Sequence, residues 1–180
     1  MRRFAIASFV AVGAALLLTA GLLYPKVVAH GFSAREDPWA IEAFVARHLR
    51  RLATGSDAKA MQNPLSSTPA VLAEARDHFA DHCAICHAND GSGKTAINDG
   101  LYPPAPDLRE AQTQDLTDGE LLYIIRNGIR FTGMPGWRGD GEENWKLVLF
   151  IRHLPKLSPE ELELMSDVIP AEPHEKGHIH

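Results

Sequence analysis

The only two cysteines of this 180-residue chain are three positions apart, and this spacing restricts the fold more than any other feature. They occur in the segment Cys83-Ala84-Ile85-Cys86-His87. On one helical turn, both thiols can form thioether bonds to the vinyl groups of one haem, and the adjoining His87 can bind its iron. We therefore expect one covalent haem c, held by Cys83, Cys86 and His87.

Other sites that use paired cysteines fit this sequence less well. A structural disulfide remains an alternative in principle. A thioredoxin-like redox pair needs a strand-helix-strand context, and the sequence shows no such pattern. A zinc ion needs two further well-spaced ligands, and the adjacent Cys86 and His87 are awkward ligands for one tetrahedral ion.

An uncharged run of 21 residues, Phe4 to Tyr24, lies near the N-terminus. At about 1.5 Å per residue, a helix of this length crosses a hydrocarbon core of about 30 Å. Arg2 and Arg3 precede the run, so the positive-inside rule predicts a single-pass segment in the cytoplasmic (inner) membrane with the rest of the chain on the periplasmic side. Val27-Val28-Ala29 also resembles a cleavage site, so residues 1–25 are expected to be either an anchor or a signal segment, and we favour the retained anchor.

The charge of the chain changes along its length. Residues 1–69 carry 8 basic and 4 acidic side chains, whereas residues 70–170 carry 9 and 17. The overall charge of −5 gives no general attraction to nucleic acid, so we expect no nucleic-acid partner. The acidic C-terminal part predicts steering towards a basic surface on a protein partner.

Helical patterns dominate the part of the chain beyond the apolar run. Asp37 and Pro38 resemble an N-cap and first helical residue, and they predict a juxtamembrane helix to about Leu52. Residues 53–69 are rich in Ser, Thr, Pro, Gly and Asn, which predicts a flexible linker. No alternating strand pattern follows, and we expect an all-α fold with long loops and four further helices, at about residues 70–83, 117–126, 142–154 and 158–168.

A second iron ligand is predicted 47 residues after His87, in Gly133-Met134-Pro135-Gly136-Trp137. Pro135 restricts Met134 to an extended backbone, and the flanking glycines permit close approach to a flat macrocycle. Met134 is therefore the expected sixth ligand of the iron, and Met61 and Met165 are weaker candidates. The alternative is that Met134 only fills the core.

Taken together, residues 70–156 resemble the class I cytochromes c. The shared features are a helix with an aromatic residue before the Cys83-x-x-Cys86-His87 motif, a proline-rich loop, and a methionine loop followed by a helix. This resemblance implies that Phe79 packs towards Trp145 and Leu149. It also implies that the Pro106 carbonyl accepts the proton of His87 and that Leu108 packs on the haem.

The resemblance also implies a function. The methionine loop, including Trp137, is similar to loops of haem domains in bacterial oxidase and dehydrogenase subunits, which implies a respiratory chain and redox protein partners. With His87 and Met134 on the iron, the domain would transfer single electrons without being an enzyme itself. Two alternatives stay open: a cytochrome subunit of a membrane dehydrogenase or oxidase, and a haem-based gas sensor or enzyme in which Met134 is displaceable.

The expected organisation follows from these features. An N-terminal membrane helix and an extra helix precede a cytochrome c-like haem domain with one covalent haem c. The tail contains three histidines near its end and is expected to be disordered. The expected segments are an anchor or uncleaved signal at 1–25, a juxtamembrane helix and linker at 26–69, a monohaem cytochrome c domain at 70–170, and a tail at 171–180.

The membrane assignment is testable on the mature protein. A retained anchor should keep the chain in membranes that are washed with carbonate, because only a spanning segment resists this treatment. N-terminal sequencing provides the control, since cleavage after Ala29 would leave a mature chain that starts at His30. Such a chain, released by the wash, would contradict the retained anchor.

Overall fold

The computed structural model describes residues 2–30, 33–139 and 141–166, and all regular structure in these residues is helical. The predicted all-α fold is therefore confirmed for this part of the chain. The expected histidine-containing tail at 171–180 lies outside the described residues. The elements are α1 (Arg2–His30), α2 (Ala40–Ala53), α3 (Ser56–Ala60), α4 (Pro69–His82), α5 (Ala84–His87), η1 (Asn98–Gly100), α6 (Ala111–Gln114), α7 (Asp118–Asn127), α8 (Gly141–His153), η2 (Leu154–Lys156) and α9 (Pro159–Ser166).

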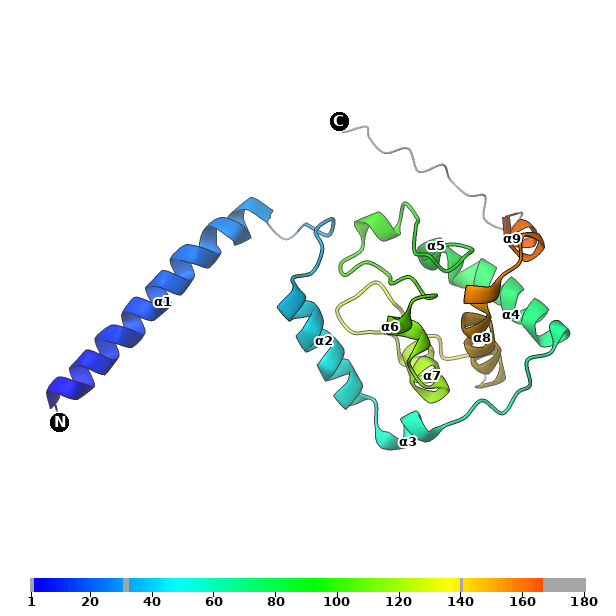
Figure 1. Cartoon of the computed structure of the whole chain (residues 1–180), viewed down its shortest axis with the longest axis horizontal. Helices are drawn as coiled ribbons and strands as arrows, with labels where there is room; N and C mark the ends of the chain where they lie inside the picture. Colours follow the sequence, from blue (N-terminus) through cyan, green and yellow to red (C-terminus); the bar gives the residue numbers. More distant parts are fainter. Residues whose placement is uncertain (1, 31–32, 140, 167–180) are drawn as a thin grey trace, which may run out of the picture. The chain divides into compact units, whose positions relative to one another are not determined.

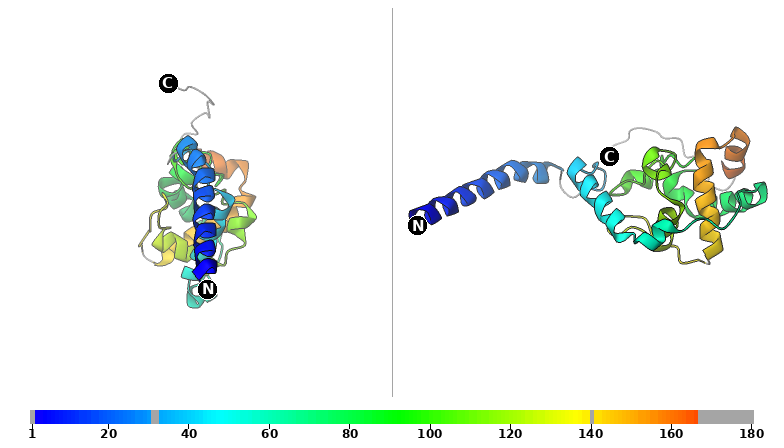
Figure 2. Two further views of the ribbon diagram at one scale, coloured as in Figure 1. Left: turned by 90° about the vertical axis from the view of Figure 1, so that its left-hand side faces the viewer. Right: turned by 60° about the horizontal axis from the view of Figure 1, so that its bottom comes forward.

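The chain divides into two units, and the first, Met1–Glu36, contains α1. This helix is continuous in the views of Figures 1 and 2. Its segment Ile6–Pro25 has a mean hydropathy of 2.3, and none of it is buried against the rest of the protein. By length and composition, α1 can cross a membrane.

The second unit begins at Asp37 and is built on the crossing of α4 and α8 (Figure 1). Phe79 of α4 and Phe150 of α8 are both buried, and their ring centroids are 5.1 Å apart. The expected partners of Phe79 were Trp145 and Leu149. Trp145 does belong to the same core, but Leu149 is only half-buried, because α8 presents its Phe150 side to α4.

Two helix starts are fixed by reciprocal hydrogen bonds, as the sequence predicts. At α7, the Glu120 backbone N–H donates to Thr117 Oγ1 and the Thr117 N–H donates to the Glu120 carboxylate. Ser158 and Glu161 make the same pair of bonds at α9. The start of α2 differs from the expectation, because the N-cap is Trp39 rather than Asp37 and no side chain caps the helix.

The segment between α2 and α4 is more ordered than the expected linker. Its short helix α3 packs against α7, where Gly119 provides the space for close approach of the two backbones. The Asn63 side-chain amide donates a hydrogen bond of 2.8 Å to the Trp145 carbonyl, and Leu65 packs on the core. These contacts attach the segment to α7, α8 and the hydrophobic core of the second unit, so it differs from a free tether.

The α3–α7 contact generates a stability prediction. A Cβ atom at Gly119 would overlap the Ala58 carbonyl, so Gly119→Ala should destabilise the protein by roughly 1–3 kcal/mol. In a helix, alanine is normally more stabilising than glycine by about 1 kcal/mol. A loss of stability in Gly119→Ala would therefore indicate the steric overlap with α3. Thermal unfolding of the purified protein measures the effect.

Gly100→Ala is the matched control, because no atom lies within 4 Å of a Cβ built there. Its effect should stay within about 0.5 kcal/mol. A Gly119→Ala protein as stable as the wild type would contradict the close approach of α3 to α7.

Candidate functional site

The cysteine motif forms a tight turn at the end of α4. The Cys83 backbone N–H continues this helix by donating to the Phe79 carbonyl at 2.8 Å. The His87 N–H then donates to the Cys83 carbonyl at 2.9 Å within the short helix α5. Because Cys83, Cys86 and His87 share one helical turn, one bound group can contact all three.

Both thiols are free, and their surroundings do not favour thiolates. Burial raises the pKa of Cys83 to about 12, with a smaller contribution from the neighbouring Cys86. Burial also raises the pKa of Cys86. Redox-active cysteine pairs have lowered pKa values, so this environment fits cysteines that bind an apolar group better than a thioredoxin-like pair.

The imidazole of His87 is buried, with 9% of the residue exposed. Its Nδ1 is enclosed and makes no hydrogen bond of ordinary geometry with the described residues. Burial lowers the pKa of His87, and the nearby Pro106 carbonyl acts in the opposite direction. The ring is therefore favoured in its neutral form, which is the form that binds a metal ion.

The loop after His87 is held against the motif by backbone hydrogen bonds. The Gly93 N–H donates to the His87 carbonyl at 2.8 Å, and the Leu108 N–H donates to the Gly91 carbonyl at 2.8 Å. Gly91 and Gly93 both have positive φ values, of 77° and 73°. A Cβ at Gly93 would lie 2.8 Å from the Ala105 carbonyl oxygen, so glycine is required for this close approach.

The buried side chain of Asn98 joins the two arms of this loop. Its amide group donates to the carbonyls of Gly93, at 2.5 Å, and Ala105, at 3.2 Å. Its carbonyl oxygen accepts a hydrogen bond from the Ala105 N–H. These contacts fix the residue that precedes Pro106.

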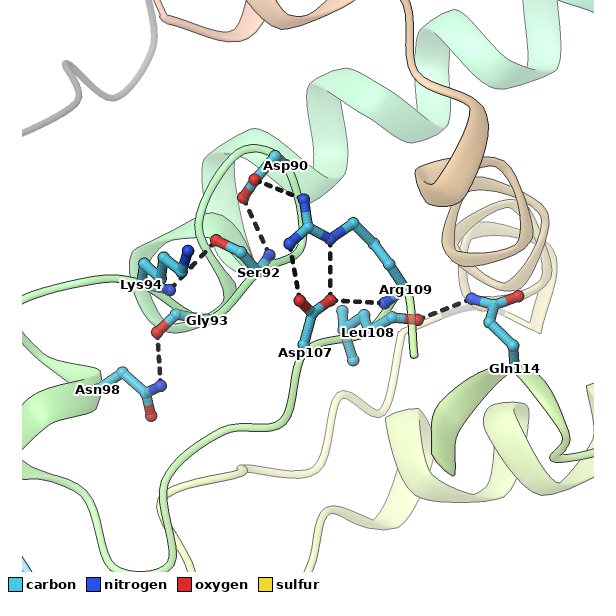
Figure 3. A network of polar contacts seen from close by, with 9 residues as sticks. All are labelled: Asp90, Ser92, Gly93, Lys94, Asn98, Asp107, Leu108, Arg109 and Gln114. Carbon is cyan, nitrogen blue, oxygen red and sulfur yellow. Dashed lines mark hydrogen bonds and ion pairs between the residues drawn. The ribbon is translucent and has the colours of Figure 1, made fainter. Parts of the chain in front are cut away.

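An ion-pair network joins Asp90, Asp107 and Arg109 (Figure 3). Arg109 contacts both oxygens of Asp107, at 2.9 and 2.7 Å, and also Asp90 at 2.8 Å. The hydrogen bond from Arg109 holds the pKa of Asp107 below its usual value. The guanidinium thereby links the start of the loop, at Asp90, to its end.

Leu108 is fixed from both sides. Its N–H is bonded to Gly91, and its carbonyl accepts a hydrogen bond of 2.7 Å from the Gln114 side chain (Figure 3). The same Gln114 amide donates to the Ile151 carbonyl of α8 at 2.9 Å. The Leu108 side chain is buried in the hydrophobic core, with 7% of the residue exposed.

The loop that carries Met134 is attached to the C-terminal end of α7. The Ile129 N–H donates to the Met134 carbonyl at 3.1 Å, and the Trp137 N–H donates to the Ile125 carbonyl at 2.8 Å. Gly128 has a φ of 65°, and a Cβ there would lie 2.6 Å from the Met134 carbonyl oxygen. The Met134 side chain is half-buried.

Trp137 connects this loop to the core and to α4. It packs against the core residues, and its ring makes an edge contact with His82, at 5.2 Å between centroids. Its carbonyl accepts a hydrogen bond from the buried Asn144 at the start of α8. The loop is therefore held at both its α7 and α8 ends.

The predicted site residues thus occupy two places. One group surrounds the cysteine turn and consists of Cys83, Cys86, His87, Pro106 and Leu108. The second, Met134 and Trp137, lies on the loop after α7. Of the weaker candidates, Met61 is 41% exposed and Met165 is buried in the core, so neither belongs to the loops around the motif.

Sequence reasoning missed the residues that hold the loop in place, namely Asn98, Arg109 and Gln114. Each acts on backbone or carboxylate groups that are distant in sequence or irregular in spacing, so no local pattern marks it. One local signal could have marked Arg109 as a residue that holds the loop: the opposite charge of Asp107, two residues before it.

The fit of these residues to a haem can be judged from the donor set. The turn offers two unpaired thiols in apolar surroundings and a neutral imidazole, which are the groups that covalent haem attachment requires. The described residues contain no group of three or more His, Cys, Asp or Glu side chains that could hold a metal ion by themselves. Two thiols and one imidazole on a single turn fit a metal that arrives within a macrocycle.

A comparison with protein families agrees with this geometry. Residues 70–151 match the family model described as cytochrome C oxidase, cbb3-type, subunit III. The match begins in α4 and ends in α8, so it includes the cysteine turn, the loop that follows His87 and the methionine loop.

Covalent attachment is the first prediction from this site. The denatured chain should retain its haem through acid–acetone extraction and show haem-dependent peroxidase staining on a gel, because thioether bonds survive unfolding. Cys83→Ala combined with Cys86→Ala should abolish the stain. If the haem of the wild-type chain is extracted completely, or if the double variant keeps it, the assignment of the two cysteines is wrong.

Proposed function

Because residues 70–151 form a c-type cytochrome domain, we propose that the chain carries single electrons through one covalent haem with His87 and Met134 as axial ligands. The observation that carries this proposal is the buried His87 imidazole on the same turn as two free thiols. When bound, the haem supplies the one-electron Fe(III)/Fe(II) couple.

The protein residues have distinct tasks in this proposal. Cys83 and Cys86 hold the group covalently, so it is retained without strong non-covalent binding. The Pro106 carbonyl, placed by Asn98 and Arg109, orients the imidazole through its Nδ1–H, as hydrogen bonds to ligand histidines generally do. Leu108 and the core beneath it exclude water, which limits the reorganisation that accompanies a change of charge.

Whether Met134 binds the iron distinguishes electron transfer from the binding of an external ligand at the iron. If the Met134 thioether bound the iron together with His87, the iron would have no free position for a substrate, and its reduced state would be favoured. Support for this role comes from the loop itself, because hydrogen bonds fix the Met134 backbone on both sides and leave its side chain half-buried. A displaceable methionine would instead give the gas-sensor alternative.

The face around the methionine loop differs in charge from the rest of the domain. Residues 121–139 contain three arginines, Arg126, Arg130 and Arg138, and no acidic side chain. All three are exposed and form no ion pair with the residues that the structure describes. Phe131, between them, is 91% exposed. We therefore propose an acidic partner at this face, although the net charge of the domain favours a basic one.

The membrane setting is supported by α1 and by the family match. We propose that α1 anchors the chain in the cytoplasmic membrane and that the haem domain works in a respiratory chain on the periplasmic side. The description of the matching family, an oxidase subunit, also favours the second candidate, a cytochrome subunit of a membrane oxidase complex. Co-purification with a larger redox enzyme would distinguish this subunit from a free carrier.

The ligand role of Met134 is tested by optical spectroscopy of the purified protein. Low-spin ferric haem with a thioether ligand has a weak red absorption band, and Met134→Ala should abolish it and lower the reduction potential. Met61→Ala is the matched control, because Met61 is exposed on the surface and should not affect the band.

Two results would contradict the assignment. One is a wild-type protein without the red band, and the other is a Met134→Ala protein that retains it. Tight binding of carbon monoxide by the reduced wild-type protein would favour the sensor or enzyme alternative instead.

A further inference from the structure

The helix α2 exposes its apolar side. Leu52 is 80% exposed, Ile41 64% and Phe44 52%, and none of the α2 residues is fully buried. At 100° per residue these side chains lie on one side of the helix. We call this side the α2 apolar face; it consists of Ile41, Phe44, Val45, Leu49 and Leu52.

Hydrogen bonds join α2 to residues outside the helix. The Tyr102 hydroxyl donates a hydrogen bond of 2.6 Å to Glu42, and the Lys59 ammonium donates one of 2.7 Å to the Arg51 carbonyl at the helix end. Thr54, directly after the helix, is buried, and Arg47 and Arg50 are half-buried, whereas Arg51 is exposed. The polarity is thus the reverse of that of an ordinary surface helix, which buries its apolar stripe.

The distance in sequence between α2 and α1 limits what can cover this face. Only nine residues, 31–39, separate the last residue of α1 from the first of α2. Even fully extended, they span about 30 Å. If α1 is retained in a membrane, α2 therefore stays within reach of that membrane's surface.

The charge of α2 fits such a surface. The helix carries three arginines, Arg47, Arg50 and Arg51, and one acidic residue, Glu42. Arg47 and Arg51 lie one turn apart along one edge of the α2 apolar face. An apolar side flanked by arginines is typical of helices that lie in the headgroup region of anionic membranes.

We propose that α2 lies in the interface of the membrane that α1 spans, with the α2 apolar face towards the acyl chains and Arg47 and Arg51 at the headgroups. This inference goes beyond electron transfer and rests on the retained anchor. Because Glu42 is bonded to Tyr102, in the loop that leads to Pro106, a membrane-bound α2 gives the haem domain a defined orientation. A second copy of the chain or a membrane subunit would be a different occupant of the face.

Photo-crosslinking identifies the occupant in the full, haem-loaded chain. Phe44 is replaced with the photoreactive p-benzoylphenylalanine, and membranes of expressing cells are irradiated and analysed by mass spectrometry. Phe131, which is even more exposed, receives the same replacement as the matched control. We expect a phospholipid adduct at Phe44 with a yield roughly fivefold or more above that at Phe131.

The same chain in vesicles tests the role of the arginines. The adduct yield at Phe44 should be at least about twofold higher with phosphatidylglycerol and phosphatidylcholine than with phosphatidylcholine alone. Arg47→Gln combined with Arg51→Gln should remove this difference. Equal yields in both vesicles would overturn the contribution of charge.

Each remaining outcome overturns a defined part of the proposal. A protein adduct of fixed mass at Phe44, or equal lipid yields at Phe44 and Phe131, overturns the membrane assignment of α2. A chain that carbonate removes from the membrane overturns the anchor as well. The haem spectrum is recorded on the same samples, so a failure of the electron-transfer proposal would be recognised separately.

Discussion

The structure depends on holding the His87 imidazole in place on a helix of only four residues. So short a helix cannot fix a side chain by itself, because its own hydrogen bonds barely offset the entropy of ordering it. The following loop supplies the missing constraint, since Gly93 binds the His87 carbonyl while Asn98 and Arg109 join the two arms of the loop. The crossing of α4 and α8 provides the rigid base for both.

The sequence was a good guide to features that depend on neighbouring residues. It predicted the capped starts of α7 and α9, the helical turn of the motif and the all-α class, because each follows from local spacing. It failed for α3, whose five residues are stabilised by contact with Gly119, more than fifty positions later. It also could not identify Asn98, because the hydrogen bonds of this side chain form only when the irregular loop returns to Ala105. The ligand role of Met134 stays a prediction.

Net charge and local charge lead to different expectations for this domain. Its acidic side chains are spread over α4, α7, α8, α9 and the loop around Arg109, and several of them are already paired with cations. The charged side chains of residues 121–139, which include Met134, are all arginines. Because charges separated by more than about 8–10 Å are largely screened at physiological salt, a partner senses the local surface rather than the total.

The methionine loop is attached through backbone atoms: Ile129 N–H to Met134 C=O, Trp137 N–H to Ile125 C=O, and the close approach at Gly128. The exposed side chains of Arg130 and Phe131 take no part in these bonds. The position of Met134 and the surface chemistry of the loop are therefore separate properties of one short segment. Mutation can accordingly change the exposed side chains of this loop while the Met134 backbone keeps its position, which makes the loop surface a modular site for evolution or design.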